Sequence, residues 1–423
     1  MTSESMKTFV RSRQYLFYLI MLMGLVAIMD QYLSTIKTTA IPYILREYFT
    51  TVNPEEYASV FSFWEGIYLI PTFFIFLLNG LNDIIGRKKS ILILVLIMGF
   101  SSLAMVYLTP SFHMFMVFYG IAMFTTVSNM WTFPIGEEAP AAKRAKYVSI
   151  VYIIGLIPLQ ALLPPILIDV LGVHWKWMYG VMFLMMIPVL ILWMFMKETG
   201  RYERIKKERQ QGIRKKHWFG LGVINKSDVR YILFSAAIWI CWLTNSFFFF
   251  MAGTYFQEIH DYSLTNWSIL LLVTLIFAMI GGVTSGRYMD KIGRTKTLII
   301  GSLGLALSLS FWGFIPINIL PIFPPIAGFF ISFSYTWIVV YIPEIFPTER
   351  RGSCMGWTTT IARVSYVGGP MLASVMLVVS PMMEWFWVAA GLIMLIPVVL
   401  LYLFKPYETQ LKELEDIEKE RIN

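Results

Sequence analysis

The sequence is poor in charged residues, cysteine and histidine, and each shortage excludes a class of protein. Charged residues make up only 14% of the 423 positions, against about 25% in ordinary globular domains. The two cysteines, Cys241 and Cys354, lie in or beside apolar segments and suggest no disulfide framework. The four histidines are scattered without metal-site spacing, at His113, His174, His217 and His260. With no phosphate-binding glycine motif either, we expect neither an ATP-driven pump nor an enzyme, and neither a cofactor nor a metal.

Apolar residues form 57% of the chain and gather into runs long enough to cross a membrane. The first run begins near Tyr15 and is itself of spanning length, so no cleavable signal peptide is expected. We therefore predict an all-α membrane protein with twelve transmembrane helices. Their expected ranges are 15–43, 57–79, 91–109, 112–133, 147–168, 175–196, 231–255, 267–285, 298–315, 319–342, 353–379 and 383–404.

The net charge of +8 is distributed in a way that predicts topology. Of the 34 Lys and Arg residues, 30 lie in the N-terminal segment, in the connections after even-numbered spans, or in the C-terminal tail. Cytoplasmic loops are enriched in Lys and Arg, so both termini should be cytoplasmic in a multi-pass plasma membrane protein. Because the basic residues sit in short loops between apolar spans, we expect the lipid bilayer, and not nucleic acid, as the partner.

Two unrelated motifs recur at one separation of 207 residues, which indicates a duplicated half of about 200 residues. The matched pairs are Asp83 and Asp290, Gly86 and Gly293, Arg87 and Arg294, Glu137 and Glu344, and Arg144 and Arg351. We predict two pseudo-symmetric six-helix bundles, at 1–196 and 231–404. A basic cytoplasmic linker at 197–230 would join them, and a cytoplasmic tail at 405–423 would form a short amphipathic helix from Tyr407 onward.

The repeated loops carry charges suited to a cytoplasmic gate. Asp83 or Asp290 can face the positive N-terminal end of a neighbouring helix, and the glycines let helix ends approach. Arg87 can pair with Glu137 or Glu138, and Arg294 with Glu344. Such clusters would hold the two halves together while the cavity opens outward. The alternative is that the loops serve topology alone.

Polar side chains concentrate in spans 1, 4, 7 and 10. Among them are Gln31, Asn129, Trp131, Trp242, Asn245, Tyr335 and Trp337. Polar groups are costly against lipid, so these spans should face protein or water. Corresponding helices in two repeats suggest a central cavity at their junction, where transporters bind substrate. For any single hydroxyl, a hydrogen bond within the helix bundle is the alternative.

The chain resembles the major facilitator superfamily over nearly its full length. The glycine, aspartate and arginine loops after spans 2 and 8 carry this resemblance. Residues 344–352 are similar to the loop after span 10 of sugar porters and related metabolite:proton symporters. Residues 30–42 resemble the acidic span-1 motif of the latter group, and residues 362–370 resemble their span-11 arginine followed by Gly-Pro. The resemblance implies a twelve-helix transporter, although Trp239 and Ile240 stand where sugar porters carry paired glutamines.

Four charged residues within or near the ends of spans call for an explanation, since a charge at the bilayer centre costs at least about 2.5–3.5 kcal/mol. At about 1.5 Å per residue, Asp30, Glu65 and Arg363 fall near the midplane, and Lys37 near the outer boundary, where it can snorkel. A carboxyl that is alternately buried and wetted can take up and release a proton, so we predict Asp30, with Glu65, in proton coupling. A static pair of Asp30 with Lys37, or with a residue elsewhere, is the alternative.

Arg363 has two possible roles. By resemblance, spans 2 and 11 pack together, so Glu65 and Arg363 would form a strut between the bundles. Alternatively, Arg363 binds a substrate carboxylate.

We therefore expect a monomeric secondary active transporter that moves a small polar metabolite with protons by alternating access. An organic anion is favoured over a neutral sugar because Arg363 and Lys37 are present and the glutamine pair is not. The predicted substrate-binding residues are Arg363, Lys37, Gln31, Asn129, Trp131, Trp242, Asn245, Tyr335 and Trp337. A uniporter without proton coupling and a transporter-like receptor or sensor are the alternatives.

Overall fold

The computed structural model describes residues 12–49, 54–75, 84–126, 128, 130–140, 144–211, 224, 226–346 and 351–409. Helices dominate these residues, and ten helical stretches among them are long and apolar enough to cross a membrane. The second and fourth spans, broken into shorter helices, complete the set. The predicted all-α fold of twelve membrane-spanning segments is confirmed.

The N-terminal half supplies six spans, of which four are broken. In chain order they are α1 (Arg13–Thr35) with α2 (Lys37–Tyr48), α3 (Pro54–Tyr68) with η2 (Ile70–Phe74), α5 (Arg87–Tyr107), α6 (Phe112–Thr126) with α7 (Thr132–Glu138), α8 (Arg144–Gly155) with α9 (Leu159–Pro165) and η4 (Ile166–Val170), and α10 (Trp177–Met194). The shorter helix α11 (Gly200–Gln210) follows.

The C-terminal half also supplies six spans, of which five are broken. Its spans are α12 (Lys226–Phe249) with α13 (Ala252–Thr254) and η5 (Tyr255–Ile259), α14 (Leu264–Ile292), α15 (Arg294–Ser310) with η6 (Trp312–Phe314), η7 (Leu320–Ile322) with α16 (Phe323–Glu344), α17 (Arg351–Ala362) with α18 (Val364–Val379), and α19 (Glu384–Ile393) with α20 (Ile396–Phe404).

The break in the first span, at Ile36, has a local cause. The hydroxyls of Ser34 and Thr35 donate to the carbonyl oxygens of Asp30 and Gln31, at 2.8 and 2.7 Å. Such bonds compete with the helix ladder and bend helices. The break makes Lys37 the first residue of α2, which packs against α3.

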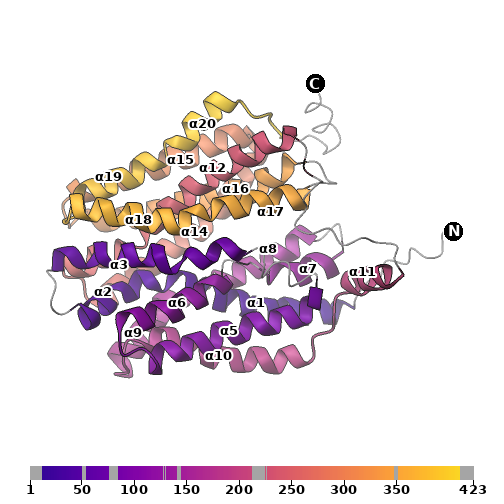
Figure 1. Cartoon of the computed structure of the whole chain (residues 1–423). Helices are drawn as coiled ribbons and strands as arrows, with labels where there is room; N and C mark the ends of the chain where they lie inside the picture. The colour runs from indigo at the N-terminus through magenta and orange to yellow at the C-terminus, as the bar shows by residue number, and fades with distance from the viewer. Residues whose placement is uncertain are drawn as a thin grey trace.

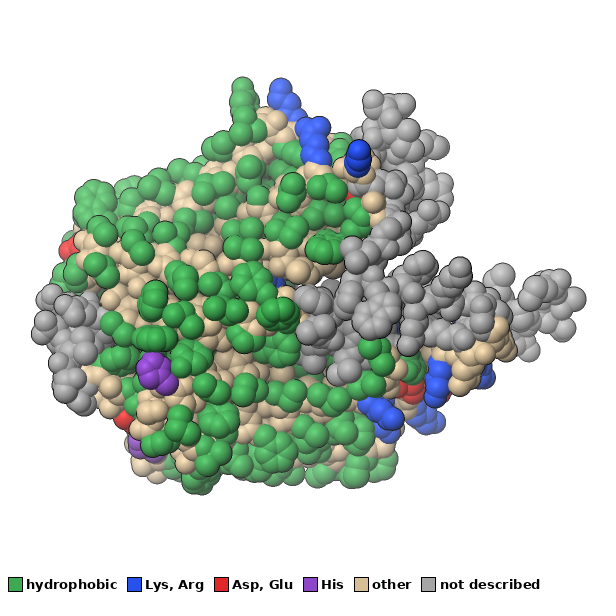
Figure 2. Space-filling view, viewed as in Figure 1, with side chains coloured by type: hydrophobic (Ala, Val, Ile, Leu, Met, Phe, Trp, Pro, Cys, Tyr) green, Lys and Arg blue, Asp and Glu red, His purple; other side chains and the backbone are tan. Residues whose placement is uncertain are grey.

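The two halves lie side by side as elongated bundles, and both termini emerge at the same end, together with α11 (Figure 1). We call this the terminal end, and the opposite end, where α2 ends and α19 begins, the distal end. Hydrophobic side chains cover much of the visible flank, while Lys and Arg gather toward the terminal end (Figure 2). Many exposed side chains, such as Phe17, Val378 and Tyr402, are large and apolar, as expected of a surface in contact with lipid.

The bundles contact each other through the distal halves of their spans. There α18 packs against α3, α14 against α9, and α13 against α2. The Trp267 indole N–H donates to the Thr39 hydroxyl at 3.1 Å. Arg46 forms an ion pair with Glu258 at 2.8 Å, also across the junction. The distal end is therefore closed in this structure.

Candidate functional site

Asp30 lies on α1 with its carboxyl group turned into the protein. The residue is only 1% exposed. Its Oδ2 accepts hydrogen bonds from the Trp131 indole N–H at 3.3 Å and from the Gln31 amide at 3.1 Å. Its Oδ1 is buried and has no hydrogen-bond partner. The acid therefore faces the interior of the molecule and not the lipid.

A row of four aromatic rings runs from Asp30 across the junction of the bundles. Trp131 and Tyr152, from the N-terminal bundle, have ring centres 6.5 Å apart with nearly parallel planes, at 14°. Tyr152 lies 6.1 Å from Tyr335 of α16, and Tyr335 stacks on Trp242 of α12 at 4.7 Å. We call these four residues the aromatic row. The polar clusters of spans 4, 7 and 10 predicted Trp131, Trp242 and Tyr335. Tyr152 was not predicted because the rest of span 5 is apolar.

Arg363 lies in the C-terminal bundle, at the break between α17 and α18. It is 6% exposed, and its guanidinium lies 5.0 Å from the centre of the Tyr366 ring. It is near enough for its charge to act on the Asp30 carboxyl and on Tyr335. An acid of one bundle and a guanidinium of the other therefore both lie beside the aromatic row.

Lys37 and Glu65 form a separate, fully buried ion pair. The Lys37 Nζ lies 2.6 Å from Glu65 Oε1, with side-chain exposures of 0% and 1%. The Tyr119 hydroxyl donates to the same oxygen at 2.7 Å. The predicted pairing of Glu65 with Arg363 is wrong, and so are the pairing of Asp30 with Lys37 and the snorkelling of Lys37. The reason is the break at Ile36, which starts α2 at Lys37 and packs it against α3.

Two predicted substrate contacts point elsewhere. The Asn245 amide donates to the carbonyl oxygen of Ala390 in α19 at 2.7 Å, and the Trp337 indole donates to that of Arg294 at 2.8 Å. Both residues are fully buried within the C-terminal bundle. Their N–H groups therefore stabilise contacts between helices of one bundle. Asn245 Oδ1 is buried with no hydrogen-bond partner, and the substrate role of both residues stays a prediction. Asn129 lies outside the described residues.

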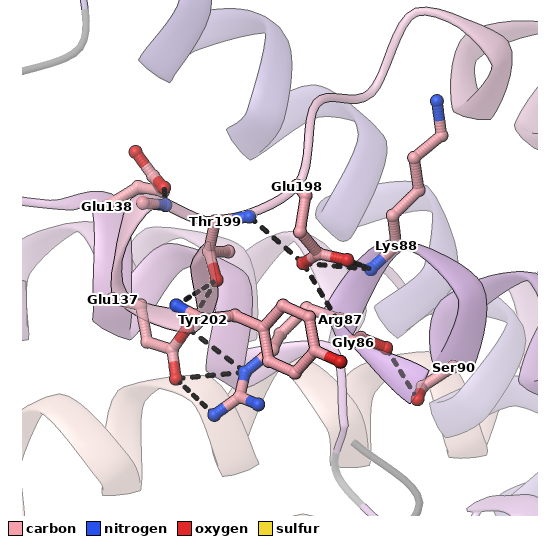
Figure 3. A network of polar contacts seen from close by, with 10 residues as sticks. Gly86, Arg87, Lys88, Ser90, Glu137, Glu138, Glu198, Thr199 and Tyr202 are labelled. Atoms are coloured by element: carbon pink, nitrogen blue, oxygen red, sulfur yellow. Dashed lines mark hydrogen bonds and ion pairs between the residues drawn. The ribbon is translucent and has the colours of Figure 1, made fainter. Parts of the chain in front are cut away.

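At the terminal end, the N-terminal bundle carries an ion cluster built on Arg87 (Figure 3). Its guanidinium donates through Nε and Nη2 to Glu137 Oε1, at 3.0 and 2.7 Å. The Thr199 hydroxyl donates to the other oxygen of Glu137 at 2.6 Å. The neighbouring Glu138 instead accepts the backbone N–H of Gly200 at 2.6 Å. The predicted Arg87–Glu137 pair is confirmed.

Helix α5 begins with a cap that the sequence analysis missed. The Glu198 carboxylate accepts the backbone N–H of Arg87 at 2.9 Å and that of Lys88 at 3.3 Å, as Figure 3 shows. A carboxylate at this position satisfies free N–H groups and interacts favourably with the helix dipole. Gly86, the residue before the helix, has a φ of +97°, a conformation that favours glycine.

The C-terminal bundle repeats the arrangement around Arg294. Its guanidinium donates to both oxygens of Glu344 at 3.2 Å, and it lies 3.4 Å from Asp290. Glu408 accepts the backbone N–H of Arg294 at 2.8 Å. Gly293 has a φ of +99°, matching Gly86. The predicted Arg294–Glu344 pair is confirmed.

The two capping carboxylates share a sequence signal. Glu198-Thr199 and Glu408-Thr409 are the same dipeptide, each following the last span of its bundle, 210 residues apart. The Thr409 hydroxyl also donates to Glu344, as Thr199 does to Glu137. The described start of the tail, residues 405–409, is not helical. The predicted helix beginning at Tyr407 is therefore wrong there, and residues 410–423 lie outside the described part.

These ion pairs do not join the halves as predicted. Arg87 and Glu137 belong to α5 and α7, and Arg294 and Glu344 to α15 and α16, so each pair lies within one bundle. The clusters hold together the helix ends of a single bundle. Asp83 lies outside the described residues, and the side chains of Arg144 and Arg351 are not described. Within the described part, no three His, Cys, Asp or Glu side chains gather as a metal site.

The sequence model of the Major Facilitator Superfamily matches residues 20–323 and 268–421. The chain belongs to the Major Facilitator Superfamily. Membership in this family of transporters makes it a membrane transporter and not an enzyme, and the repeat of six spans is that of the family fold.

Known relatives share modest identity with this Major Facilitator chain. It is 24% identical to the putative metabolite transport protein YaaU of Escherichia coli, over 69% of this chain and 71% of that protein. It is 29% identical to the cis,cis-muconate transport protein of Acinetobacter baylyi, over 28% and 27%. It is 24% identical to the synaptic vesicle 2-related protein of Xenopus laevis over 57% of this chain, and it spans about half, 52%, of that protein.

Solved structures agree in fold. The xylose transporter XylE of E. coli, in an inward open conformation, matches with a TM-score of 0.75 at 18% identity, covering 96% of this chain and 99% of that one. The human organic anion transporter MFSD10 matches with a TM-score of 0.65 at 12% identity, covering 91% and 99%.

Proposed function

We propose that this protein is a proton-coupled secondary transporter of a small organic anion, working as a monomer by alternating access in the plasma membrane. The terminal end would face the cytoplasm, because nearly all Lys and Arg residues lie on that side of the spans. We also propose that residues 1–196 and 231–404 are its two moving bundles, linked by 197–230 and followed by a tail from 405.

The proton-coupling proposal rests on the different hydrogen bonding of the two Asp30 carboxyl oxygens. Oδ2 receives two N–H groups, while Oδ1 is buried with no hydrogen-bond partner. A buried carboxylate needs compensation at both oxygens, and a proton on Oδ1 would supply it by making the group neutral. When the bundles part at the terminal end, water would reach the carboxyl and the proton would leave.

Arg363 supports an anionic substrate. A guanidinium presents paired N–H groups that fit a carboxylate, and burial strengthens such a contact. The substrate would lie between Asp30 and Arg363, against Gln31 and the aromatic row. The relative named for cis,cis-muconate and the solved organic anion transporter are in line with this class. The match to a xylose transporter makes a sugar the second candidate.

The test is uptake into proteoliposomes of purified protein under an imposed pH gradient, with labelled mono- and dicarboxylates and pentoses. Asp30→Asn should abolish accumulation driven by the gradient but retain exchange of substrate at equal pH. Arg363→Gln should lose transport of carboxylates. Glu384→Gln is the matched control, because that acid lies at the distal end and accepts a hydrogen bond from Ser380 of its own bundle. Unchanged accumulation by Asp30→Asn would reject proton coupling, and no transport by the unaltered protein would favour a receptor.

A further inference from the structure

The Lys37 ammonium group lies at the junction of the bundles and has partners from both. On the N-terminal side, Glu65 holds it at 2.6 Å. On the C-terminal side, the rings of Phe247 and Phe250 each have their centre 4.2 Å from Nζ. Lys37 is completely buried. The cation therefore sits between a carboxylate of one bundle and two ring faces of the other.

The N-terminal side fixes the cation in place without help from the other bundle. Glu65 is itself held by the Tyr119 hydroxyl, which donates to the same oxygen as Lys37 at 2.7 Å. Lys37 is the first residue of α2, so its backbone is fixed by the break at Ile36. Because a buried ammonium without a partner is very costly, Glu65 is what keeps Lys37 charged and directed at the junction.

The C-terminal bundle attracts the Lys37 ammonium group only while the distal end is closed. Phe247 lies in the last turn of α12 and Phe250 directly follows that helix. A cation over a ring face is attracted by the ring's quadrupole, most strongly where water is excluded. Both rings move with the C-terminal bundle, so this attraction exists only while the distal ends of the bundles are together.

We propose that Lys37 is a latch residue for the distal end, with Glu65 and Tyr119 as its positioning residues and the Phe247 and Phe250 rings as its receptor. Opening the distal end removes the rings from the ammonium and exposes the latch. The latch sets the ratio of distal-closed to distal-open molecules. It requires only that the bundles separate, whether or not a proton is coupled to transport.

The chain contains a matched lysine for comparison. Lys176 is also largely buried, pairs with Glu47 at 2.9 Å, and lies 5.2 Å from the centre of the Tyr48 ring. All of its partners belong to the N-terminal bundle. Removing Lys176 therefore changes a similar set of contacts without touching the junction.

The test is a distance measurement across the distal end in the full-length protein. Spin labels would be placed on cysteines introduced at Val170 and Met382, which are exposed at that end on different bundles. The native Cys241 and Cys354 would be replaced by alanine. Double electron–electron resonance then gives the populations of short and long distances in lipid nanodiscs.

The double variant Phe247→Leu/Phe250→Leu should raise the ratio of open to closed molecules at least tenfold, since one desolvated cation–π contact corresponds to roughly 30-fold in an equilibrium. Lys37→Met/Glu65→Gln should shift it in the same direction, because it removes the latch without leaving a buried charge alone. Lys176→Met should leave the distribution unchanged. Unaltered distances in either double variant, or an equal shift in Lys176→Met, would overturn the proposal.

Discussion

Replacing Gly253 with alanine tests whether the distal end closes as the structure shows. Gly253 lies in α13, where that short helix meets α2 of the other bundle. A Cβ atom at this position would lie 1.5 Å from the carbonyl oxygen of Thr38. Real Cβ atoms essentially never come within 3.0 Å of another heavy atom. The backbones would therefore have to separate by about 1.5 Å more before alanine fits.

The size of the effect follows from what the new methyl group meets. Thr38 presents a backbone oxygen, which cannot turn aside as a flexible side chain can. Forcing extra atoms into a packed contact costs about 1–3 kcal/mol. Because the two backbones belong to different bundles, this cost applies only to the distal-closed state. The ratio of open to closed molecules should rise by about 5- to 150-fold.

The assay is the same distal distance measurement, combined with thermal unfolding, and the chain offers two controls. Gly281→Ala creates a similar clash, 2.1 Å from the carbonyl oxygen of Phe329, but inside the C-terminal bundle. It should lower the melting temperature without changing the distances between bundles. A Cβ atom at Gly368 would have no described atom within 4 Å. Gly368→Ala should therefore change neither the melting temperature nor the distances between bundles.

The reasoning would be refuted by a Gly253→Ala protein whose distal distances match those of the unaltered chain. It would also be refuted if Gly281→Ala shifted the distances as far as Gly253→Ala does. In the first case the approach of α13 to α2 would not limit closure. In the second, any local loss of packing would open the distal end.

Further predictions concern stability and are checked by thermal unfolding of the purified protein. Glu198→Gln should cost about 0.3–1 kcal/mol because the negative charge at the start of α5 is lost, whereas Glu203→Gln, an exposed change on α11, should have little effect. Arg87→Met should cost about 3–5 kcal/mol because its carboxylate partner is only 9% exposed, and Arg294→Met should cost less because its partner is 25% exposed. Burial lowers the pKa of His260 below 6.5, so the unfolded chain protonates first as the pH falls. Stability should therefore decline from about pH 7 to pH 5, and less so in His260→Gln.

The terminal-end clusters were predictable because their signal repeats in the sequence. Arg87 and Glu137 recur as Arg294 and Glu344 at a single separation, and paired glycines mark the helix starts. Two copies of one charge pattern restrict which acid can meet which arginine. What the repeat could not show is that each pair stays inside its own bundle. Whether a pair lies within one bundle depends on which helices are neighbours in space. A constant separation in sequence does not identify those neighbours.

The sequence pattern does not predict which way a side chain points from its helix. Tyr335 and Trp337 lie two residues apart in α16, about 200° around a helix of 3.6 residues per turn. One faces the junction and the other packs inside the bundle. Counting polar residues identifies the helix that carries a site but not its face. Here the Trp337 indole N–H and the Asn245 amide N–H donate to backbone carbonyl groups within the bundle.

The charges at the junction obey a different rule from those at the terminal end. The arginine–glutamate clusters that stabilise each bundle at the terminal end occur twice, because each bundle must solve the same packing problem there. Residues at the junction occur once, because a proton, a substrate or a latch needs only one site for two bundles. The positions 207 residues away confirm the contrast, with Ala237 for Asp30, Thr244 for Lys37, Leu272 for Glu65 and Leu156 for Arg363. Buried charge at a break in the repeat is not sufficient by itself, since Lys176 meets both conditions and pairs with Glu47 inside one bundle. A partner on the other bundle, such as the Phe247 and Phe250 rings beside Lys37, is what identifies a residue by which one bundle acts on the other.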